Sequence, residues 1–241
     1  MLVFVGCSSP SKESDDMVTI KGYVTDYNGN PLDSVSVGWQ NSDFDHELFG
    51  TTTDKNGYYE VKVKKGRYHN MGALNMDRYI VTGSTLPEED LRLEFWGWNF
   101  IADRDTTFNM QYDRFEVYGV NVFRVQGGAP GYHIFCRPMS LTRYLEQKKM
   151  GNGNGSLAPS PEQLGVKVTV DGEEVSVRMK QAIKEYWDET EEIEAYMLFV
   201  DLPKHKATLP YRVFRIQMTD LENGDKGEAT YHYELKGYVN N

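Results

Sequence analysis

Residues 20–26 read Ile-Lys-Gly-Tyr-Val-Thr-Asp, and the six residues that follow, 27–32, read Tyr-Asn-Gly-Asn-Pro-Leu. Further along, residues 51–61 read Thr-Thr-Thr-Asp-Lys-Asn-Gly-Tyr-Tyr-Glu-Val. In these segments apolar residues alternate with polar ones beside Asn-Gly and Asn-Pro turns, which is the pattern of antiparallel hairpins. We therefore predict two hairpins of a small antiparallel sandwich.

The spacing of the turn residues resembles the carboxypeptidase regulatory-like domain, whose fold is transthyretin-like. One pattern of that family, Gly-x-Val-x-Asp-x-x-Gly-x-Pro-Leu, matches at Gly22, Val24, Asp26, Gly29, Pro31 and Leu32. A second, Thr-x-x-Asp-x-x-Gly-x-Tyr, matches at Thr51, Asp54, Gly57 and Tyr59. The resemblance covers residues 17–112 and implies a non-catalytic module.

Composition and charge narrow the range of functions. A chain of 241 residues holds one or two domains, and its many tyrosines indicate an all-β protein. The formal net charge of −10 disfavours binding to a phosphate backbone. We therefore expect no nucleic-acid partner.

Residues 113–241 predict a second domain. Further alternating segments follow, with an Asp-Gly turn at residues 171–172, and residues 211–229 are similar to the last hairpin of immunoglobulin-like modules in bacterial surface proteins. The fold class expected is all-β, with two tandem antiparallel β-sandwich domains, transthyretin-like and then immunoglobulin-like. Two stretches are expected to differ: a long flexible loop over residues 146–163, and one or two helical turns over residues 179–187.

The N-terminal segment resembles a bacterial lipoprotein signal. An apolar run ends at Gly6 and Cys7, and a polar tether follows up to residue 16. The resemblance implies that Cys7 carries the lipid, that residues 1–16 are a signal remnant and tether, and that the true start lies upstream of Met1 or the chain is trimmed. Acidic residues after Cys7 also resemble surface-export signals of Bacteroidota lipoproteins. The protein would then bind the membrane through acylated Cys7. We expect it in the cell envelope as an outer-membrane lipoprotein, either facing the periplasm or exposed on the surface. An ordinary N-terminal strand with an incidental cysteine remains the alternative.

An aromatic segment at residues 91–100 is the candidate ligand-binding site. Strand alternation places Trp96, Trp98 and Phe100 on one face, opposite Phe95. Three interpretations stay open: packing against the second domain, packing in the core of the first, and a platform that stacks on the sugar rings of an extracellular glycan or anchors an envelope protein.

Acidic residues near the C-terminus are the candidate metal ligands. Asp220, Glu222 and Asp225 surround an Asn-Gly turn and could bind calcium, although turn chemistry explains them without a metal. No other cofactor is expected.

No catalytic residue is assigned. The chain contains no Gly-x-Ser-x-Gly, His-Glu-x-x-His or Cys-x-x-Cys motif, and Cys136 lies in an apolar run where a buried, inert thiol is expected. The leading hypothesis is a non-catalytic, lipid-anchored envelope protein that acts as an adhesion, binding or assembly module. The alternatives are an accessory glycan-binding lipoprotein of a polysaccharide-uptake system and an unrecognised hydrolase that uses paired carboxylates.

Overall fold

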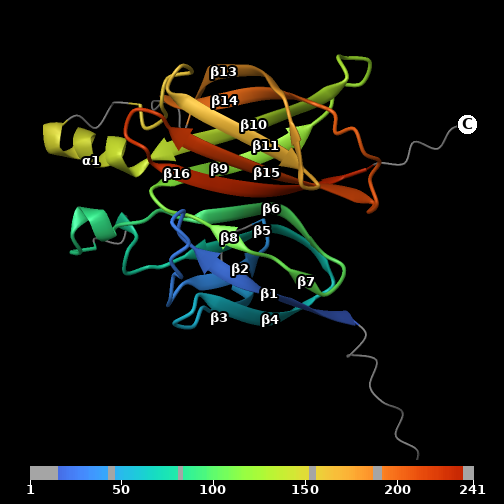
Figure 1. Ribbon diagram of the computed structural model, residues 1–241, viewed down its shortest axis with the longest axis horizontal. Helices are drawn as coiled ribbons and strands as arrows, with labels where there is room; N and C mark the ends of the chain where they lie inside the picture. The colour runs from blue at the N-terminus through green and yellow to red at the C-terminus, as the bar shows by residue number, and fades with distance from the viewer. Residues whose placement is uncertain (1–15, 43–46, 81–83, 152–155, 187–191, 236–241) are drawn as a thin grey trace, which may run out of the picture.

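Three β-sheets build the part of the chain that the computed structural model describes, namely residues 16–42, 47–80, 84–151, 156–186 and 192–235 (Figure 1). The first sheet has the order β4-β1-β7, with β8 also paired to β1, and the second has the order β13-β14-β10-β9. The third has eight strands in the order β12-β11-β15-β16-β6-β5-β2-β3. The fold class expected from the sequence, all-β with sandwiches in tandem, is confirmed.

The first sandwich packs the small β1 sheet against one half of the eight-stranded sheet. Its core includes Ile20, Trp39 and Phe95, all of which are fully buried. The strands are β1 (Met17–Thr25), β2 (Ser36–Gln40), β3 (Glu47–Thr52), β4 (Tyr58–Lys64), β5 (Gly66–Leu74), β6 (Phe95–Ala102), β7 (Thr106–Thr107) and β8 (Met110–Gln111).

Two aspartates of the quoted stretch organise loops rather than hairpins. The carboxylate of Asp26 accepts hydrogen bonds from the backbone N–H groups of Asn28 and Asn30, both at 2.8 Å, and Asp54 accepts from Asn56 at 2.8 Å. Each loop carries the chain from one sheet of the sandwich to the other, since β1 pairs with β4 and β2 with β3. The predicted hairpins are therefore wrong: the turns are real, but they cross between layers.

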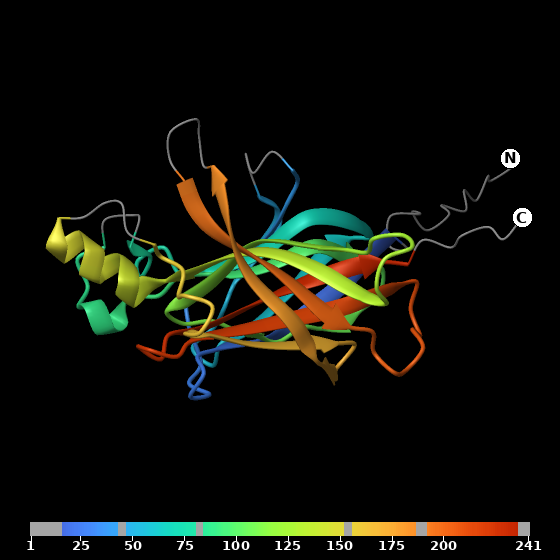
Figure 2. The same ribbon diagram turned by 90° about the horizontal axis from the view of Figure 1, so that it is seen from above.

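The second sandwich packs the β13-β14-β10-β9 sheet against the other half of the eight-stranded sheet (Figure 2). Its core includes Ile134, Leu198 and Phe214. The predicted domain boundary, at residues 112 and 113, lies between β8 and β9. The strands are β9 (Phe115–Phe123), β10 (Gly131–Ser140), β11 (Leu164–Val170), β12 (Glu173–Val175), β13 (Val177–Tyr186), β14 (Glu192–Asp201), β15 (Tyr211–Asp220) and β16 (Lys226–Glu234).

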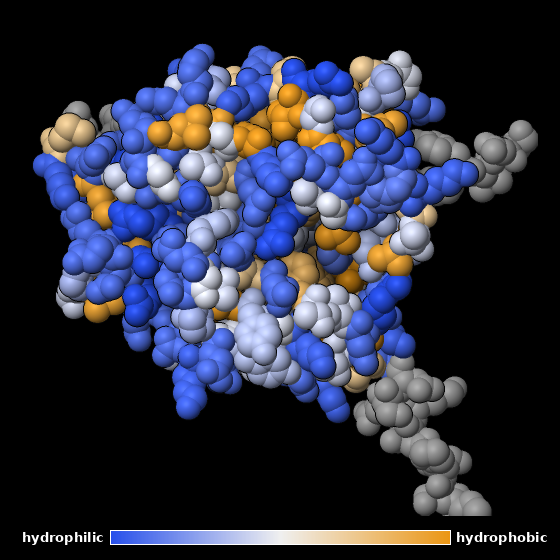
Figure 3. Space-filling view, viewed as in Figure 1, coloured by the Kyte–Doolittle hydropathy of each residue, from blue (hydrophilic) through white to orange (hydrophobic). Residues whose placement is uncertain are grey.

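The two sandwiches share one continuous sheet. Strand β16 of the second pairs in parallel with β6 of the first, with Thr230 opposite Gly97. Where the two halves meet, the cores lie on opposite faces of the sheet: in β6, Phe95 belongs to the first core and Trp98 to the second. In the space-filling view, apolar side chains gather on the upper half of the molecule, over the region of β13, β14 and β10 (Figure 3).

Two local predictions in the second half need correction. Helical turns were predicted over residues 179–187, of which residue 187 lies outside the described residues. Residues 179–186 belong instead to β13, in which Met179 pairs with Phe199 and Ile183 with Ala195. The predicted loop over residues 146–163 begins inside helix α1 (Leu141–Met150), which Gly151 ends in a left-handed conformation at φ 67°. Further along that segment Ala158 is buried. No helix in the described residues is long and apolar enough to cross a membrane.

Gly22 permits a close approach of two backbone segments in the first sandwich. A Cβ atom at this position would lie 2.1 Å from the backbone oxygen of Phe108, which is itself held because Phe108 donates its N–H to the oxygen of Lys21 at 2.7 Å. Gly66, at the start of β5, would place its Cβ in open space. The pair therefore offers a matched test of packing.

We expect Gly22→Ala to lower the free energy of unfolding by about 1–3 kcal/mol, because the backbone at Phe108 has to move to admit the methyl group. Gly66→Ala should stay within about 0.5 kcal/mol of the wild type. Urea unfolding of the three proteins measures both values, and equal losses in the two variants would contradict this packing.

Candidate functional site

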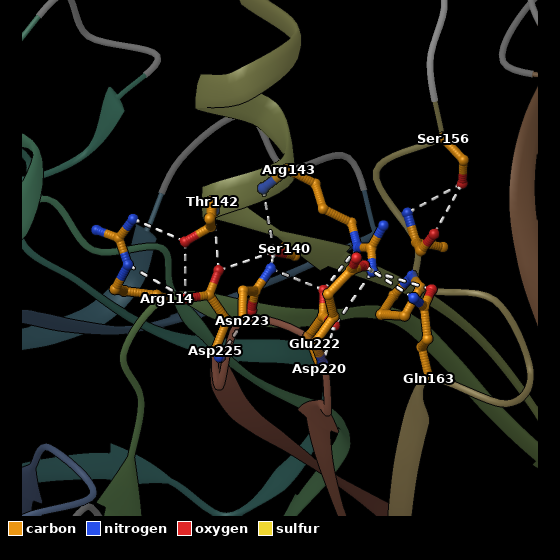
Figure 4. A network of polar contacts seen from close by, with 12 residues as sticks. Arg114, Ser140, Thr142, Arg143, Ser156, Gln163, Asp220, Glu222, Asn223 and Asp225 are labelled. Carbon is orange, nitrogen blue, oxygen red and sulfur yellow. Dashed lines mark hydrogen bonds and ion pairs between the residues drawn. The ribbon is translucent and has the colours of Figure 1, made fainter.

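The three predicted metal ligands come together in the turn between β15 and β16, at the base of helix α1 (Figure 4). The side chains of Asp220 and Asp225 are 0% and 4% exposed, whereas that of Glu222 is 57% exposed. Two buried carboxylates must be compensated, because an unpaired buried charge is costly.

Asp225 fixes the start of the helix. Its carboxylate accepts hydrogen bonds from the hydroxyl of Ser140 and the backbone N–H of Thr142, both at 2.8 Å, and from Nε of Arg114 at 3.2 Å. Ser140 is also the N-cap residue, and its Oγ accepts from the N–H of Arg143. A carboxylate at this end of a helix also interacts favourably with the helix dipole. The turn and the helix are thus held as one unit.

Asp220 is compensated by the second arginine. Arg143 donates from Nε to Oδ2 of Asp220 at 2.6 Å and from Nη2 to Glu222 at 2.7 Å, and Asn223 donates to Asp220 at 2.8 Å. The carboxylate of Asp220 raises the pKa of the Arg143 guanidinium.

The acidic turn is therefore built around arginines. In the described part of the chain, no group of three or more His, Cys, Asp or Glu side chains is arranged to hold a metal ion. Asp220, Glu222 and Asp225 lie in one turn, and guanidinium and hydroxyl groups surround the two buried carboxylates. Sequence reasoning missed this because Arg114 and Arg143 come from the starts of β9 and α1, far from the turn in sequence.

We expect Asp225→Ala to lower the free energy of unfolding by about 3–5 kcal/mol, because it leaves the buried side of Arg114 and two helix donors without their acceptor. Glu88→Ala is the control, since its ion pair with Lys149 is exposed and worth about 0–1 kcal/mol. Urea unfolding measures both, and a loss at Asp225 no larger than that at Glu88 would contradict the role of the network.

The aromatic segment does not form an open platform. Trp98 is 6% exposed and Phe100 is 1% exposed, whereas Trp96 is partly buried. The rings of Trp96 and Trp98 stack at 5.2 Å and both meet Tyr118 of the second sandwich edge-on. The glycan-binding alternative thus loses the exposed rings on which it was based.

The expectation that these three rings share one face is also wrong. Asn99 between them has a left-handed backbone, with φ 50°. This interrupts the strand alternation, so Trp98 joins the core of the second sandwich and Phe100 that of the first. Asn99 donates its side-chain N–H to the backbone oxygen of His232 at 2.6 Å, which ties β6 to β16.

His232 is buried at the junction, by which we mean the place where β6 of the first sandwich meets β16 of the second. The sequence did not reveal this contact. Its ring is stacked between Phe100 and Tyr211, and its Nδ1 accepts the backbone N–H of Ile101 at 2.9 Å. Because Nδ1 is the acceptor, the ring must be neutral here. Burial lowers the pKa of His232 from 6.5 to about 4.

The stability of the protein should therefore fall in acid. An unfolded histidine binds a proton below about pH 6.5, whereas His232 in the folded protein does so only near pH 4, so up to about 3 kcal/mol is lost as the pH falls through this window. His232→Gln keeps an acceptor for Ile101 but does not titrate. We expect the difference in unfolding free energy between wild type and variant to shrink by that amount between about pH 7 and about pH 4. A difference independent of pH would contradict the buried neutral ring.

Two cysteines remain to be placed. Cys136 is fully buried in β10, so the expected burial of this residue is confirmed, and burial raises the pKa of its thiol to about 12. Cys7 lies outside the described residues.

The comparisons with known proteins do not assign a family. No family model matches the chain, and no curated protein matches it. Among solved structures, the major pilin BcpA of Bacillus cereus matches at 11% identity and a TM-score of 0.25, covering 90% of this chain and 69% of the pilin. A candidate adhesin from Bacteroides ovatus matches at 12% identity and a TM-score of 0.26, covering 98% of this chain and 92% of the other. The full-length major pilin SpaD of Corynebacterium diphtheriae matches at 7% identity and a TM-score of 0.24, covering 90% of this chain and 64% of the pilin. TM-scores of this size assign neither a shared fold nor a shared function.

Proposed function

We propose that the chain is a non-catalytic, lipid-anchored protein of the cell envelope, whose two sandwiches serve as an adhesion, binding or assembly module. The observation that carries the proposal is the continuous eight-stranded sheet, because the pairing of β16 with β6 joins the two sandwiches without a flexible linker. Such a body can hold a binding surface at a fixed distance from its attachment point.

The position of the first strand supports the same function. Strand β1 begins at Met17, at the lower edge of the molecule and on the side of the first sandwich away from the second (Figure 1). A lipid on Cys7 would therefore leave the second sandwich directed away from the membrane. Strand β1 pairs with β4 on one side and with β7 and β8 on the other, so a load on the tether acts on an internal strand.

The lipid anchor can be tested directly by Cys7→Ala in the native host, expressed from its natural start. We expect the wild-type protein in the membrane fraction with an acylated Cys7 peptide in mass spectrometry, and the variant in the soluble fraction, because two or three acyl chains at about 0.8 kcal/mol per buried CH2 are needed to hold the body at the membrane. Ser8→Ala is the matched control and should fractionate as the wild type. An unmodified Cys7, or a variant that stays with the membrane, would refute the anchor.

A further inference from the structure

Two glutamates from different sandwiches meet at the junction. Glu94 stands directly before β6 and is partly buried, while Glu116 lies in β9 and is only 2% exposed. The indole N–H of Trp96 donates to Oε1 of Glu116 at 2.9 Å, and the hydroxyl of Tyr79 donates to Oε1 of Glu94 at 3.3 Å. The two carboxyl groups lie within hydrogen-bonding reach of each other.

A hydrogen bond between two carboxyl groups requires a proton on one of them, because an ionised carboxylate is only an acceptor. Trp96 and Tyr79 each donate one hydrogen bond, but neither supplies a positive charge. This differs from the acidic turn, where each buried carboxylate has its own arginine. A proton on one of the two carboxyl groups would neutralise this buried pair without a cation.

The charged groups around the pair are already engaged. Arg137 of β10, whose positive charge lowers the pKa of the Tyr118 hydroxyl, donates from Nε to Glu185 at 2.9 Å. Arg92, two residues before Glu94, is paired with Asp113 at 2.7 Å. Burial raises the pKa of the neighbouring hydroxyls of Tyr79 and Tyr118, so both remain neutral donors or acceptors.

We propose that Glu94 and Glu116 form one proton-binding site, and that the shared proton holds the start of β9 against β6, so that the junction tightens in acid and loosens when the proton leaves. Loss of the proton would place two negative charges side by side in a buried site. This arrangement disfavours double ionisation, as in other carboxylate pairs that share a site.

The sign of the pH dependence follows from the same burial. Burial raises the pKa of Glu94, and it raises that of Glu116 well above the usual value. The folded protein therefore keeps a proton that the unfolded chain has released. The stabilisation is complete below the ordinary glutamate pKa and is lost as the pH rises through the pKa of the folded pair.

The test is Glu116→Gln, which keeps an oxygen for Trp96 and supplies an amide donor to Glu94 without titrating. We expect the midpoint temperature of the wild type to fall by several degrees more than that of the variant between about pH 5 and about pH 9. We also expect the tryptophan emission of the wild type to titrate over this range and that of the variant to stay constant. Trp96→Phe should remove the same emission change, which assigns it to the indole beside the pair.

Glu88→Gln is the control, since it removes an exposed carboxylate in the turn before β6 and should leave both pH profiles as in the wild type. Glu94→Gln is a second variant that replaces the other partner and should reproduce the Glu116→Gln result if the latter fails to fold. Parallel midpoint profiles in wild type and Glu116→Gln, or a wild-type emission that does not titrate, would overturn the proposal.

Discussion

The parallel pairing of β16 with β6 is the interaction on which the rest of the structure depends. It joins two half-sheets into one sheet, and at the join one core lies on one face and the other core on the opposite face. Each strand of the pair is therefore largely buried on both of its faces. In β6 this is achieved by Asn99, whose left-handed backbone redirects Phe100 towards the first core while Trp98 faces the second. Asn tolerates this conformation better than most residues.

The same constraint explains why β16 carries buried polar side chains. Glu228, Thr230 and His232 alternate along the strand on the face away from Ala229 and are almost fully buried. Glu228 accepts from Nε of Arg215 at 2.8 Å and from the backbone N–H of Gln111 at 3.2 Å, so this face also holds the segment that leads into the second sandwich. Polar groups with fixed partners favour one arrangement of two sandwiches over others that apolar contacts alone would permit.

The sequence predicts local features well and the meeting of distant segments poorly. Alternation identifies most strands, and Asp26 and Asp54 mark their loops correctly because an aspartate bonds to its own following backbone. Alternation does not reveal which strand pairs with which, so the crossing of these loops between sheets was missed. Spacing also fails at Met179 and Ile183, since residues four apart share a face in a helix and in a strand. In the acidic turn the carboxylates are visible in the sequence, but the arginines that neutralise them are not.

The two titratable groups at the junction act in opposite directions. His232 must be neutral, so its contribution weakens as the pH falls below about 6.5, whereas the pair of Glu94 and Glu116 needs a proton, so its contribution weakens as the pH rises above about 4.5. Between pH values of about 4.5 and about 6.5, the change in the contribution of His232 partly offsets the change in that of the glutamate pair. Outside this range only one of the two contributions changes with pH. With these groups acting together, the junction is held most firmly in mildly acidic surroundings.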